Sequence, residues 1–475
     1  MSVGASPLAG IPLPDSRALS REPFGLLIHV FGDPGVAEIL SGDGIIESWL
    51  EAERALAFAE AEAGLIEASD AEAVAKGATL AAIDREVLWE KTRLVGYPIL
   101  PLVRMVAASL PEGPNGRVHY GATTQDIMDT GLALQLVRVL ERLDDLVVEL
   151  GDELARLVSE HRDTAVAART HGQQAVPTTF GAKLASFLGE FARHRERLVG
   201  TRGRVAIVSL YGAGGTSAAL GENAARVRAG FARRLGLEVR GTSWHAARDS
   251  LGEFAMLCAM LSASAARFSN EVINLSRSEI AEVSEGGDHH YGASSTMPQK
   301  RNPIRSEVVV GMSIVASALA GAVGRTMVVP HERAAGEWQA EWQLLPEVAS
   351  LAAGALSNSS HVARHLSVHP GTMRANMEAD GGRLLAEAFM IGLSGSMGRE
   401  AAHDLVYEAA QEAREGGDLL ACLRRLVPAA QSALLEKVAG STSYDRYLGE
   451  AGPMCDRGLA EWREATVDRR EASRQ

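Results

Sequence analysis

Residues 131 to 161 read GLALQLVRVLERLDDLVVELGDELARLVSEH, and their leucines and valines indicate how the chain folds. Apolar residues recur there at steps of three and four, the spacing that lines up one face of an α-helix. The residues on that face are Leu136, Val139, Leu140, Leu143, Leu146, Val147, Leu150, Leu154 and Leu157. The face is longer than that of an average globular helix, so the segment is typical of a bundle of long helices.

Three further segments carry the same kind of apolar face. They run from Gly181 to about Arg202, from Ser250 to about Val283, and from Pro303 to about Val323. Aromatic residues make up only 5% of the chain and alternating apolar and polar runs are few, which disfavours sheet. The sequence therefore predicts an all-α fold with a central long-helix bundle.

Helix-breaking residues divide the rest of the chain. A chain of 475 residues is too long for one small core. The turn-rich PEGPNGR closes a region of shorter helices, and HLSVHPG precedes another such region. We therefore predict an N-terminal helical domain at residues 1–115, a central helix-bundle domain at 116–365 and a C-terminal helical domain at 366–475.

Composition argues against several kinds of partner. The net charge of -13 disfavours nucleic acid or an anionic membrane as the main partner. The three cysteines form no CxxC pair, which disfavours a disulfide framework or zinc cluster and favours a reducing compartment. The first residues show no secretory signal, and no uninterrupted apolar run of about 18 residues indicates a membrane span. We expect a cytoplasmic protein that contacts neither nucleic acid nor membrane.

The stretch GASSTMPQKRNP, residues 292 to 303, is the first candidate site. Its glycine gives backbone freedom, as in a loop that can move. Asn302 followed by Pro303 predicts a helix N-cap with proline at the first helical position. The loop would then bring Ser294 and Lys300 to the positive end of a helix, where an anion is stabilised. The alternative interpretation is an ordinary glycine-rich loop before a helix.

Two other polar loops lie between the long helical segments, HYGATTQDIMDTG at 119 to 131 and RTHGQQAVPTTFG at 169 to 181. Asp126 and Asp129 have DxxD spacing, but we interpret them as a solvated helix start rather than as magnesium ligands. The pair His289-His290 is interpreted as exposed. Because neither HExxH nor GxxxxGK occurs, the sequence predicts no metal site and no phosphate cradle.

The side chains of the three loops suggest one kind of chemistry. Their hydroxyl, amide and cationic groups could bind carboxylates: Thr123, Thr124, Thr170, Lys300 and Asn302. Histidine is the residue type most often used to transfer a proton near neutral pH, which makes His171 a candidate for that role. A serine can act as a base if its oxyanion is stabilised. Together these groups describe removal of a proton beside a carboxylate, with departure of a leaving group from the neighbouring carbon.

The three loops, in this order and each between long helices, resemble the fumarase/aspartase superfamily of lyases. GASSTMPQKRNP is similar to the GSSxMPxKxNP loop of that family, with Ala293 as a mild departure. The resemblance implies a three-domain, mostly helical subunit. It also implies a homotetramer built on a central 20-helix bundle, active sites shared among three subunits, a small dicarboxylate or tricarboxylate substrate, and no cofactor.

The resemblance also implies residue roles. Ser294 matches the general base, His171 the general acid, and Glu307 the carboxylate partner of that acid. The implied substrate-binding residues are Thr123, Thr124, Thr170, Lys300, Asn302, Arg333 and His119.

Within the superfamily the chain is most similar to the branch of 3-carboxy-cis,cis-muconate cycloisomerases and adenylosuccinate lyases. The similar stretches are FGDPGVAEIL, GATTQDIMDT, WHAARD, HERAAGEWQAEW and MRANMEADGGRLLAEA. Two departures disfavour a muconate substrate, because that branch often has an apolar residue at His171 and an asparagine at Tyr97. The N-terminal arginine-tyrosine-serine pattern of adenylosuccinate lyases is missing, which weighs against a purine nucleotide.

The expected activity is therefore a base-catalysed β-elimination on a small substituted succinate that releases fumarate. A carbon–nitrogen lyase similar to nitrosuccinate lyase is ranked first, the cycloisomerase second and adenylosuccinate lyase third. Some superfamily members serve as lens crystallins, so a non-enzymatic role is a further alternative. It is not favoured, because Ser294, His171 and Lys300 are all present.

Overall fold

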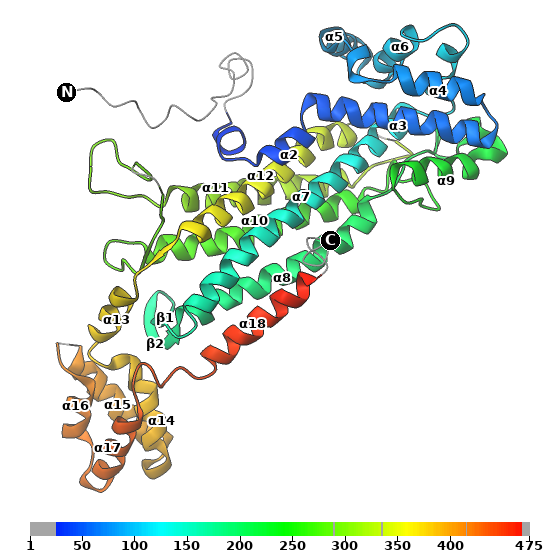
Figure 1. Ribbon diagram of the computed structural model, residues 1–475. Coiled ribbons are helices and arrows are strands. Elements are labelled where there is room, and N and C mark those ends of the chain that lie inside the picture. Colours follow the sequence, from blue (N-terminus) through cyan, green and yellow to red (C-terminus); the bar gives the residue numbers. More distant parts are fainter. Residues whose placement is uncertain (1–24, 288–289, 334–335, 415, 468–475) are drawn as a thin grey trace, which may run out of the picture.

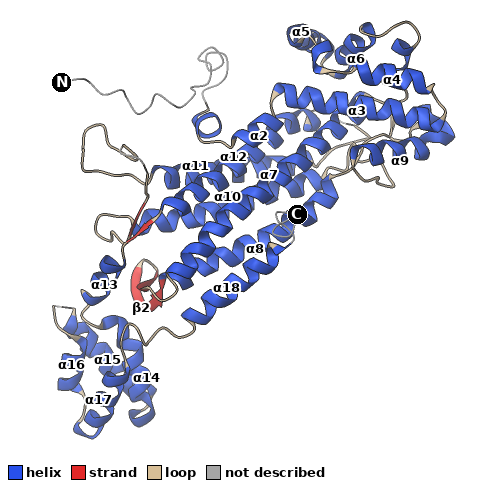
Figure 2. Cartoon of the chain, viewed as in Figure 1, coloured by secondary structure: helices blue, strands red, loops and turns tan. Residues whose placement is uncertain are grey.

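The computed structural model describes residues 25–287, 290–333, 336–414 and 416–467. His289 of the histidine pair predicted to be exposed lies outside these ranges. The described chain is mostly helical, with a long bundle in the middle and smaller groups of helices at its two ends (Figures 1 and 2). The predicted all-α fold class is confirmed.

Five helices of 23 to 37 residues form the bundle: α7 (Thr124–Glu160), α8 (Phe180–Val205), α10 (Asp249–Leu275), α11 (Ile304–Thr326) and α12 (Glu337–His365). The nine apolar residues predicted to face the core of α7 are all at most 2% exposed. Burial of each such side chain contributes about 1.5–3 kcal/mol, so this face is a large part of what holds the bundle together.

Two details of the bundle differ from the sequence prediction. Helix α12 was not predicted, and it continues through Pro346. Helix α10 ends at Leu275 rather than near Val283, since the chain turns there and Ala281 takes a left-handed φ of 48°. That conformation does not continue a right-handed helix.

The N-terminal helices pack at one end of the bundle (Figure 1). They are α3 (Gly42–Ala63), α4 (Ala68–Gly77), α5 (Arg85–Val95) and α6 (Ile99–Ala108). The short α2 (Pro34–Ile39) instead packs along α7 and α12 of the bundle. Helix α9 (Ala224–Leu235), from the middle of the sequence, packs against α3 and shares its hydrophobic cluster. This group therefore includes residues far beyond the first 115.

The C-terminal helices pack at the other end (Figure 1). They are α13 (Pro370–Glu378), α14 (Ala386–Met397), α15 (Arg399–Ala413), α16 (Leu419–Leu426) and α17 (Ser432–Ser441). The last helix, α18 (Ala451–Ala465), returns to pack along α8, and its Trp462 is 1% exposed. A Cβ at Gly151 of α7 would lie 2.2 Å from that indole, so the glycine permits the contact.

The strands among the described residues are few, as predicted, and they form a hairpin and a second antiparallel pair. β1 (Ala165–Thr170) pairs antiparallel with β2 (Gln173–Thr179), with an irregularity between Ala167 and Arg169. β3 (Val283–Ser284) pairs antiparallel with β4 (Ser367–Val368). Short helical turns complete the described elements: η1 (Leu26–Val30), η2 (Leu80–Ala82), η3 (Pro114–Arg117), η4 (Ala218–Asn223), η5 (Arg383–Leu385) and η6 (Ala429–Gln431).

The predicted domain boundaries after residues 115 and 365 stay predictions. The hydrophobic clusters cross both of them, because Trp338 belongs to the N-terminal cluster and Trp462 to the bundle cluster. A third cluster lies within helices α14 to α17.

Two bundle helices, α10 and α11, are long and apolar enough by composition alone to cross a membrane. The apolar window of α10 is 67% buried, as expected for a helix in a protein core. The window of α11 is only 33% buried, and its Ile314 and Val315 are 68% and 40% exposed. One side of α11 is therefore an apolar surface that the described part of one chain leaves uncovered.

Candidate active site

The threonine loop lies directly before α7, at the end of the bundle near the N-terminal helices (Figure 1). Thr123 is the N-cap of α7 and Thr124 its first residue, and both are half-buried. The Thr123 N–H donates to Asp126 Oδ2 at 3.0 Å, which fixes the first turn of the helix. The threonine pair thus lies at the positive end of a 37-residue helix, where a carboxylate is stabilised.

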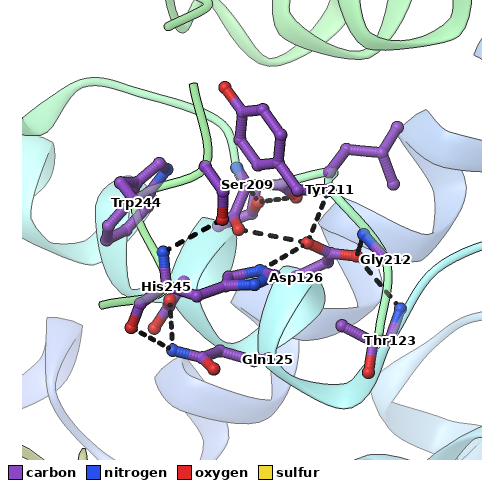
Figure 3. A network of polar contacts seen from close by, with 12 residues as sticks. Thr123, Gln125, Asp126, Ser209, Tyr211, Gly212, Trp244 and His245 are labelled. Carbon is purple, nitrogen blue, oxygen red and sulfur yellow. Dashed lines mark hydrogen bonds and ion pairs between the residues drawn. The ribbon is translucent and has the colours of Figure 1, made fainter. Parts of the chain in front are cut away.

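Asp126 joins this helix start to two distant loops (Figure 3). Its Oδ1 accepts from the Tyr211 N–H at 2.8 Å, from Ser209 Oγ at 3.2 Å and from His245 Nε2 at 2.8 Å. Its Oδ2 accepts from the Gly212 N–H at 2.9 Å. The Asp126 side chain is 0% exposed and that of His245 is 2% exposed, so their contact is shielded from solvent.

The interpretation of Asp126 and Asp129 as a solvated helix start was wrong. Both are buried, at 0% and 1% exposure, because the helix packs this polar face against other loops. Burial acts to raise the pKa of Asp126, but the His245 imidazole and the Tyr211 and Thr123 N–H groups outweigh it and hold the pKa below its usual range. Asp126 is therefore a buried carboxylate that positions the threonine loop.

Arg333 reaches the same end of the bundle from the loop between α11 and α12. Its Nε donates to Gln125 Oε1 at 2.6 Å, and Gln125 Nε2 donates to Asp129 Oδ2 at 3.1 Å. Arg333 Nη2 is buried and has no hydrogen-bond partner among the described residues. A buried guanidinium nitrogen without an acceptor costs free energy, and a bound anion would remove that cost.

His119 also lies at this end and has a partner that the sequence did not indicate. Its Nδ1 is 2.6 Å from Glu53 Oε1 on α3, and the Glu53 side chain is only 1% exposed. Burial acts to lower the pKa of His119, but the Glu53 carboxylate outweighs it and raises that pKa above its usual value. His119 is thereby favoured as a cation close to the threonine loop.

His171 occupies the tip of the hairpin between β1 and β2, beyond the far end of α7. His171 and Gly172 have φ values of 53° and 76°, the left-handed pair that a two-residue hairpin turn requires. Both residues and the neighbouring Thr170 are exposed. Near the tip of the hairpin, Arg169 of β1 forms two hydrogen bonds, 2.8 and 2.6 Å long, with the buried carboxylate of Glu282. The histidine is therefore held on an anchored loop.

Ser294 lies in the loop between β3 and α11, at the same end as the hairpin. It is half-buried, and its Oγ accepts from the Thr296 N–H at 3.3 Å and from the Met297 N–H at 3.1 Å. Two backbone donors aimed at one hydroxyl oxygen would stabilise the alkoxide form. Lys300 of the same loop is exposed.

The predicted helix start after this loop was wrong in its details. Helix α11 begins at Ile304 with Pro303 as N-cap, and Asn302 instead closes the loop, since its N–H and Nδ2 donate to Gly292 O at 2.8 and 3.0 Å. The first turn of α11 is also occupied by a carboxylate of this chain. Glu285 Oε1 accepts from the Ser306 N–H at 2.8 Å. The positive end of α11 therefore serves Glu285 rather than a free anion.

One chain does not bring all the predicted residues together. Thr123, Thr124, His119 and Arg333 lie at one end of the bundle, and Thr170, His171, Ser294, Lys300 and Asn302 at the other. The 37 residues of α7 separate the threonine and histidine loops by about 55 Å at 1.5 Å per residue. Glu307 is exposed in the first turn of α11, and no hydrogen bond joins it to His171 within the described part of one chain.

The polar partners at the threonine end were missed by sequence reasoning. Gln125, Asp126 and Asp129 lie on the buried side of α7, and their partners come from Ser209 to Gly212, His245 and Arg333. The sequence did contain a signal for these partners, because α7 begins with a run of polar residues although its other side is apolar. Within the described ranges no group of three or more His, Cys, Asp or Glu side chains is arranged to hold a metal ion.

Comparison with protein families gives two matches. Residues 40–317 match a family model described as "Lyase", and residues 382–458 match one described as "Adenylosuccinate lyase C-terminus".

Several proteins resemble the chain along most of their length. A trans-aconitate decarboxylase 1 of Mycosarcoma maydis is 34% identical, covering 96% of this chain and 92% of that protein. A 3-carboxy-cis,cis-muconate cycloisomerase of Pseudomonas aeruginosa is 38% identical, with 89% and 93% covered. An N-acetyl-S-(2-succino)cysteine lyase of Dickeya dadantii is 35% identical, with 82% and 86% covered. The crystal structure of 3-carboxy-cis,cis-muconate lactonizing enzyme from Pseudomonas putida superposes with a TM-score of 0.85 at 34% identity, covering 93% of this chain and 99% of that one.

Proposed function

The chain belongs to the fumarase/aspartase superfamily of lyases, and on that premise we propose that it eliminates a leaving group from a small substituted succinate and releases fumarate. The substrate is a dicarboxylate or tricarboxylate. The general base is Ser294 and the general acid is His171, with Glu307 as the carboxylate partner of His171 in the assembled site.

The observation that carries this proposal is the hydrogen bonding of Ser294. A serine hydroxyl is a weak base unless its alkoxide is stabilised. The N–H groups of Thr296 and Met297 both donate to Ser294 Oγ, at 3.3 and 3.1 Å, so the oxygen already sits where two dipoles favour negative charge. Such a group supplies the strong base that removal of a proton beside a carboxylate requires.

The elimination balances as follows. The Ser294 alkoxide takes a proton from the carbon next to one carboxylate, and the electrons of that C–H bond form the new C=C bond. The bond from the neighbouring carbon to the leaving group breaks, and the leaving group departs with both electrons. If the leaving group is an amine, His171 donates the proton that it needs. Lys300 and Asn302 stabilise the carboxylate on which charge accumulates in the transition state.

The other carboxylate of the substrate binds at the threonine end of a second chain. Thr123 and Thr124 there stand at the positive end of α7, and the buried Arg333 Nη2 has no partner among the described residues. The raised pKa of His119, which the Glu53 carboxylate causes against the effect of burial, adds a second cation. These groups fit a carboxylate better than a neutral or cationic group.

We rank cleavage of a carbon–nitrogen bond first, because His171 can protonate a basic nitrogen as it leaves. The similarity to an N-acetyl-S-(2-succino)cysteine lyase supports a substituted succinate, since that protein is named for one. Lactone formation on 3-carboxy-cis,cis-muconate is the second candidate, and the Pseudomonas relatives favour it. Adenylosuccinate cleavage is third.

We further propose a homotetramer whose active sites each combine loops from three chains. One chain separates the threonine loop from the serine and histidine loops, so an isolated subunit has no complete site. The five long helices would contribute twenty to the core of a tetramer, and the exposed Ile314 and Val315 of α11 would be covered there. The free thiols Cys258, Cys422 and Cys455 are all buried, which fits the proposed cytoplasmic location.

The test runs the reaction in reverse. The purified protein is incubated with fumarate and, separately, ammonium, a panel of amines, nitrite and N-acetylcysteine, while loss of fumarate absorbance is followed. Consumption with one nitrogen nucleophile, abolished in Ser294→Ala, is the expected result. Parallel assays with 3-carboxy-cis,cis-muconate and adenylosuccinate cover the alternatives. Turnover of the muconate with no fumarate consumption by any nucleophile would replace the elimination with the cycloisomerase.

A further inference from the structure

A cavity of about 210 Å³ lies between the N-terminal helices and the bundle. Four tryptophans line it, Trp49 of α3, Trp89 of α5, and Trp338 and Trp342 of α12. Its polar lining includes the carboxylates of Asp129 and Glu341. The cavity contains none of the residues proposed for the elimination, so it is a separate feature of the molecule.

The aromatic wall is built from rings that hold one another in place. Trp338 and Trp342 meet edge to face, with ring centroids 5.2 Å apart and planes at 81°. Tyr97 stacks on Trp338 at 5.7 Å and 23°, and Trp338 Nε1 donates to Asp129 Oδ1 at 3.3 Å. Trp338 is 5% exposed, whereas Trp342 is 38% exposed and Trp89 is 39% exposed. The cavity therefore opens to solvent beside Trp342 and Trp89. The wall is thus rigid inside and accessible at one edge.

One guanidinium and two carboxyl groups lie beside the cavity. Arg248 lies between Asp129 and Glu341, with Nη1 to Asp129 Oδ2 at 2.7 Å and Nη2 to Glu341 Oε2 at 2.5 Å. All three side chains are 1% exposed, so solvent does little to screen them. Two carboxyl groups thus share one guanidinium. Burial raises the pKa of Glu341 against the effect of Arg248, so a cation in the cavity would favour the ionised form of Glu341. Among the described residues that line the cavity there is no lysine, arginine or histidine to balance the second carboxylate.

We propose that this cavity binds a small organic cation, an ammonium ion carried on an aromatic or branched apolar body. The electron-rich faces of tryptophan attract a cation, most strongly where water is excluded. The second carboxyl group attracts the cation further in its ionised form, and that form disfavours an anion in the same space. The volume sets the size, because a cavity of roughly 150 Å³ is enough for benzene. A ring with a short ammonium tail fits the larger cavity seen here.

The cation site is independent of the proposed elimination, but a ligand bound there would lie near the candidate carboxylate site. Asp129 accepts from Gln125, and Gln125 accepts from Arg333, so the cavity and the candidate carboxylate site share a chain of hydrogen bonds. The cation site and the dicarboxylate site would then differ in the charge of their ligands and lie on opposite sides of Gln125. Fumarate should therefore not displace the cation.

Calorimetric titration of the full-length protein with 2-phenylethylammonium tests the proposal. Two probes of similar shape, neutral 2-phenylethanol and anionic 3-phenylpropionate, are titrated in parallel. Saturable binding of the ammonium, at least tenfold weaker binding of the alcohol and no displacement of the bound ammonium by the carboxylate are expected. Equal affinity for ammonium and alcohol, displacement of the bound ammonium by the carboxylate, or no saturable binding of the ammonium would overturn it.

Two variants locate the binding. Trp89→Leu changes a cavity residue that is outside the buried charge cluster, so it should fold normally and weaken ammonium binding at least fivefold. Leu94→Ala is the matched control on the same helix, since Leu94 is 82% exposed and does not line the cavity. Unchanged affinity in Trp89→Leu, or displacement of the ammonium by fumarate, would refute this location.

Discussion

Replacing Glu60 by glutamine is expected to flatten the dependence of stability on pH. Glu60 lies on α3 with 0% exposure, and neither of its carboxyl oxygens has a hydrogen-bond partner among the described residues. Burial, and to a lesser degree the charge of Glu53, raises the pKa of Glu60 to about 9 from an ordinary 4.5. The folded protein therefore holds a neutral carboxylic acid at this position near neutral pH.

The sign and size of the effect follow from the two pKa values. Between about pH 4.5 and pH 9 the folded state holds a proton at Glu60 that the unfolded state has released, so stability falls as pH rises through this window. From pH 5 to pH 8 the loss is three units at about 1.36 kcal/mol each, or about 4 kcal/mol. Unfolding of the whole chain has an entropy of roughly 2.1 cal/mol/K per residue, or about 1 kcal/mol/K for 475 residues. A loss of about 4 kcal/mol therefore lowers Tm by about 4 °C.

The assay is thermal unfolding of wild type and Glu60→Gln at pH 5, 6, 7 and 8. Glutamine has a similar shape to the protonated acid and does not ionise, so the two curves should nearly meet at pH 5 and separate by about 4 °C at pH 8, with the variant higher. Glu90→Gln, at an exposed carboxylate of α5, is the control and should follow wild type. Parallel curves for wild type and Glu60→Gln would refute the reasoning.

Four further predictions concern the candidate active site. Ser294→Ala should lower kcat by about 10²–10⁴ with the fold and oligomer intact, and retention of more than about a tenth of the activity would contradict its role as base. Lys300→Met should weaken carboxylate recognition and carbanion stabilisation by a few kcal/mol, measured as kcat/KM, and unchanged kinetics would remove Lys300 from the site. Mixing inactive Ser294→Ala and His171→Ala proteins should restore some activity after subunit exchange, whereas demonstrated exchange without recovery would contradict shared sites. Asp126→Asn should place an amide NH₂ against buried N–H donors and destabilise the protein by about 2–6 kcal/mol in denaturant unfolding, at about 1–3 kcal/mol for each of two orphaned N–H groups. A loss below about 0.5 kcal/mol would show that Asp126 does not hold the threonine loop.

The long helices could be predicted because helical periodicity is a local property. The steps of three and four from Leu136 to Leu157 are legible in the sequence and indicate a buried face whatever covers it. Helix α12 escaped prediction because Pro346 interrupts the pattern, although the folded bundle tolerates the proline. The predicted N-cap at Asn302 was wrong because a residue distant in sequence takes its place. Glu285, seventeen residues before Asn302, accepts from N–H groups in the first turn of α11.

The chemistry-bearing residue types were likewise legible, and the similarity of the three loops to one superfamily was sufficient to suggest roles for Ser294, His171 and Lys300. Their separation along the bundle was suggested by helix length alone. The sequence did not reveal how the polar residues of α7 are satisfied. Asp126 is paired with His245, 119 residues away, and Gln125 with Arg333, 208 residues away.

The sequence by itself thus determined the helical class, the long bundle and the residue types of the candidate site. The tertiary structure alone decided that Asp126 is a buried partner of His245, that Glu53 holds His119, and that four tryptophans line a cavity beside the ion pairs of Arg248. The physical reason is that the spacing of apolar residues encodes which face of a helix is buried. It does not encode what that face is buried against, and the pKa values and pairings of buried polar groups depend on those distant neighbours.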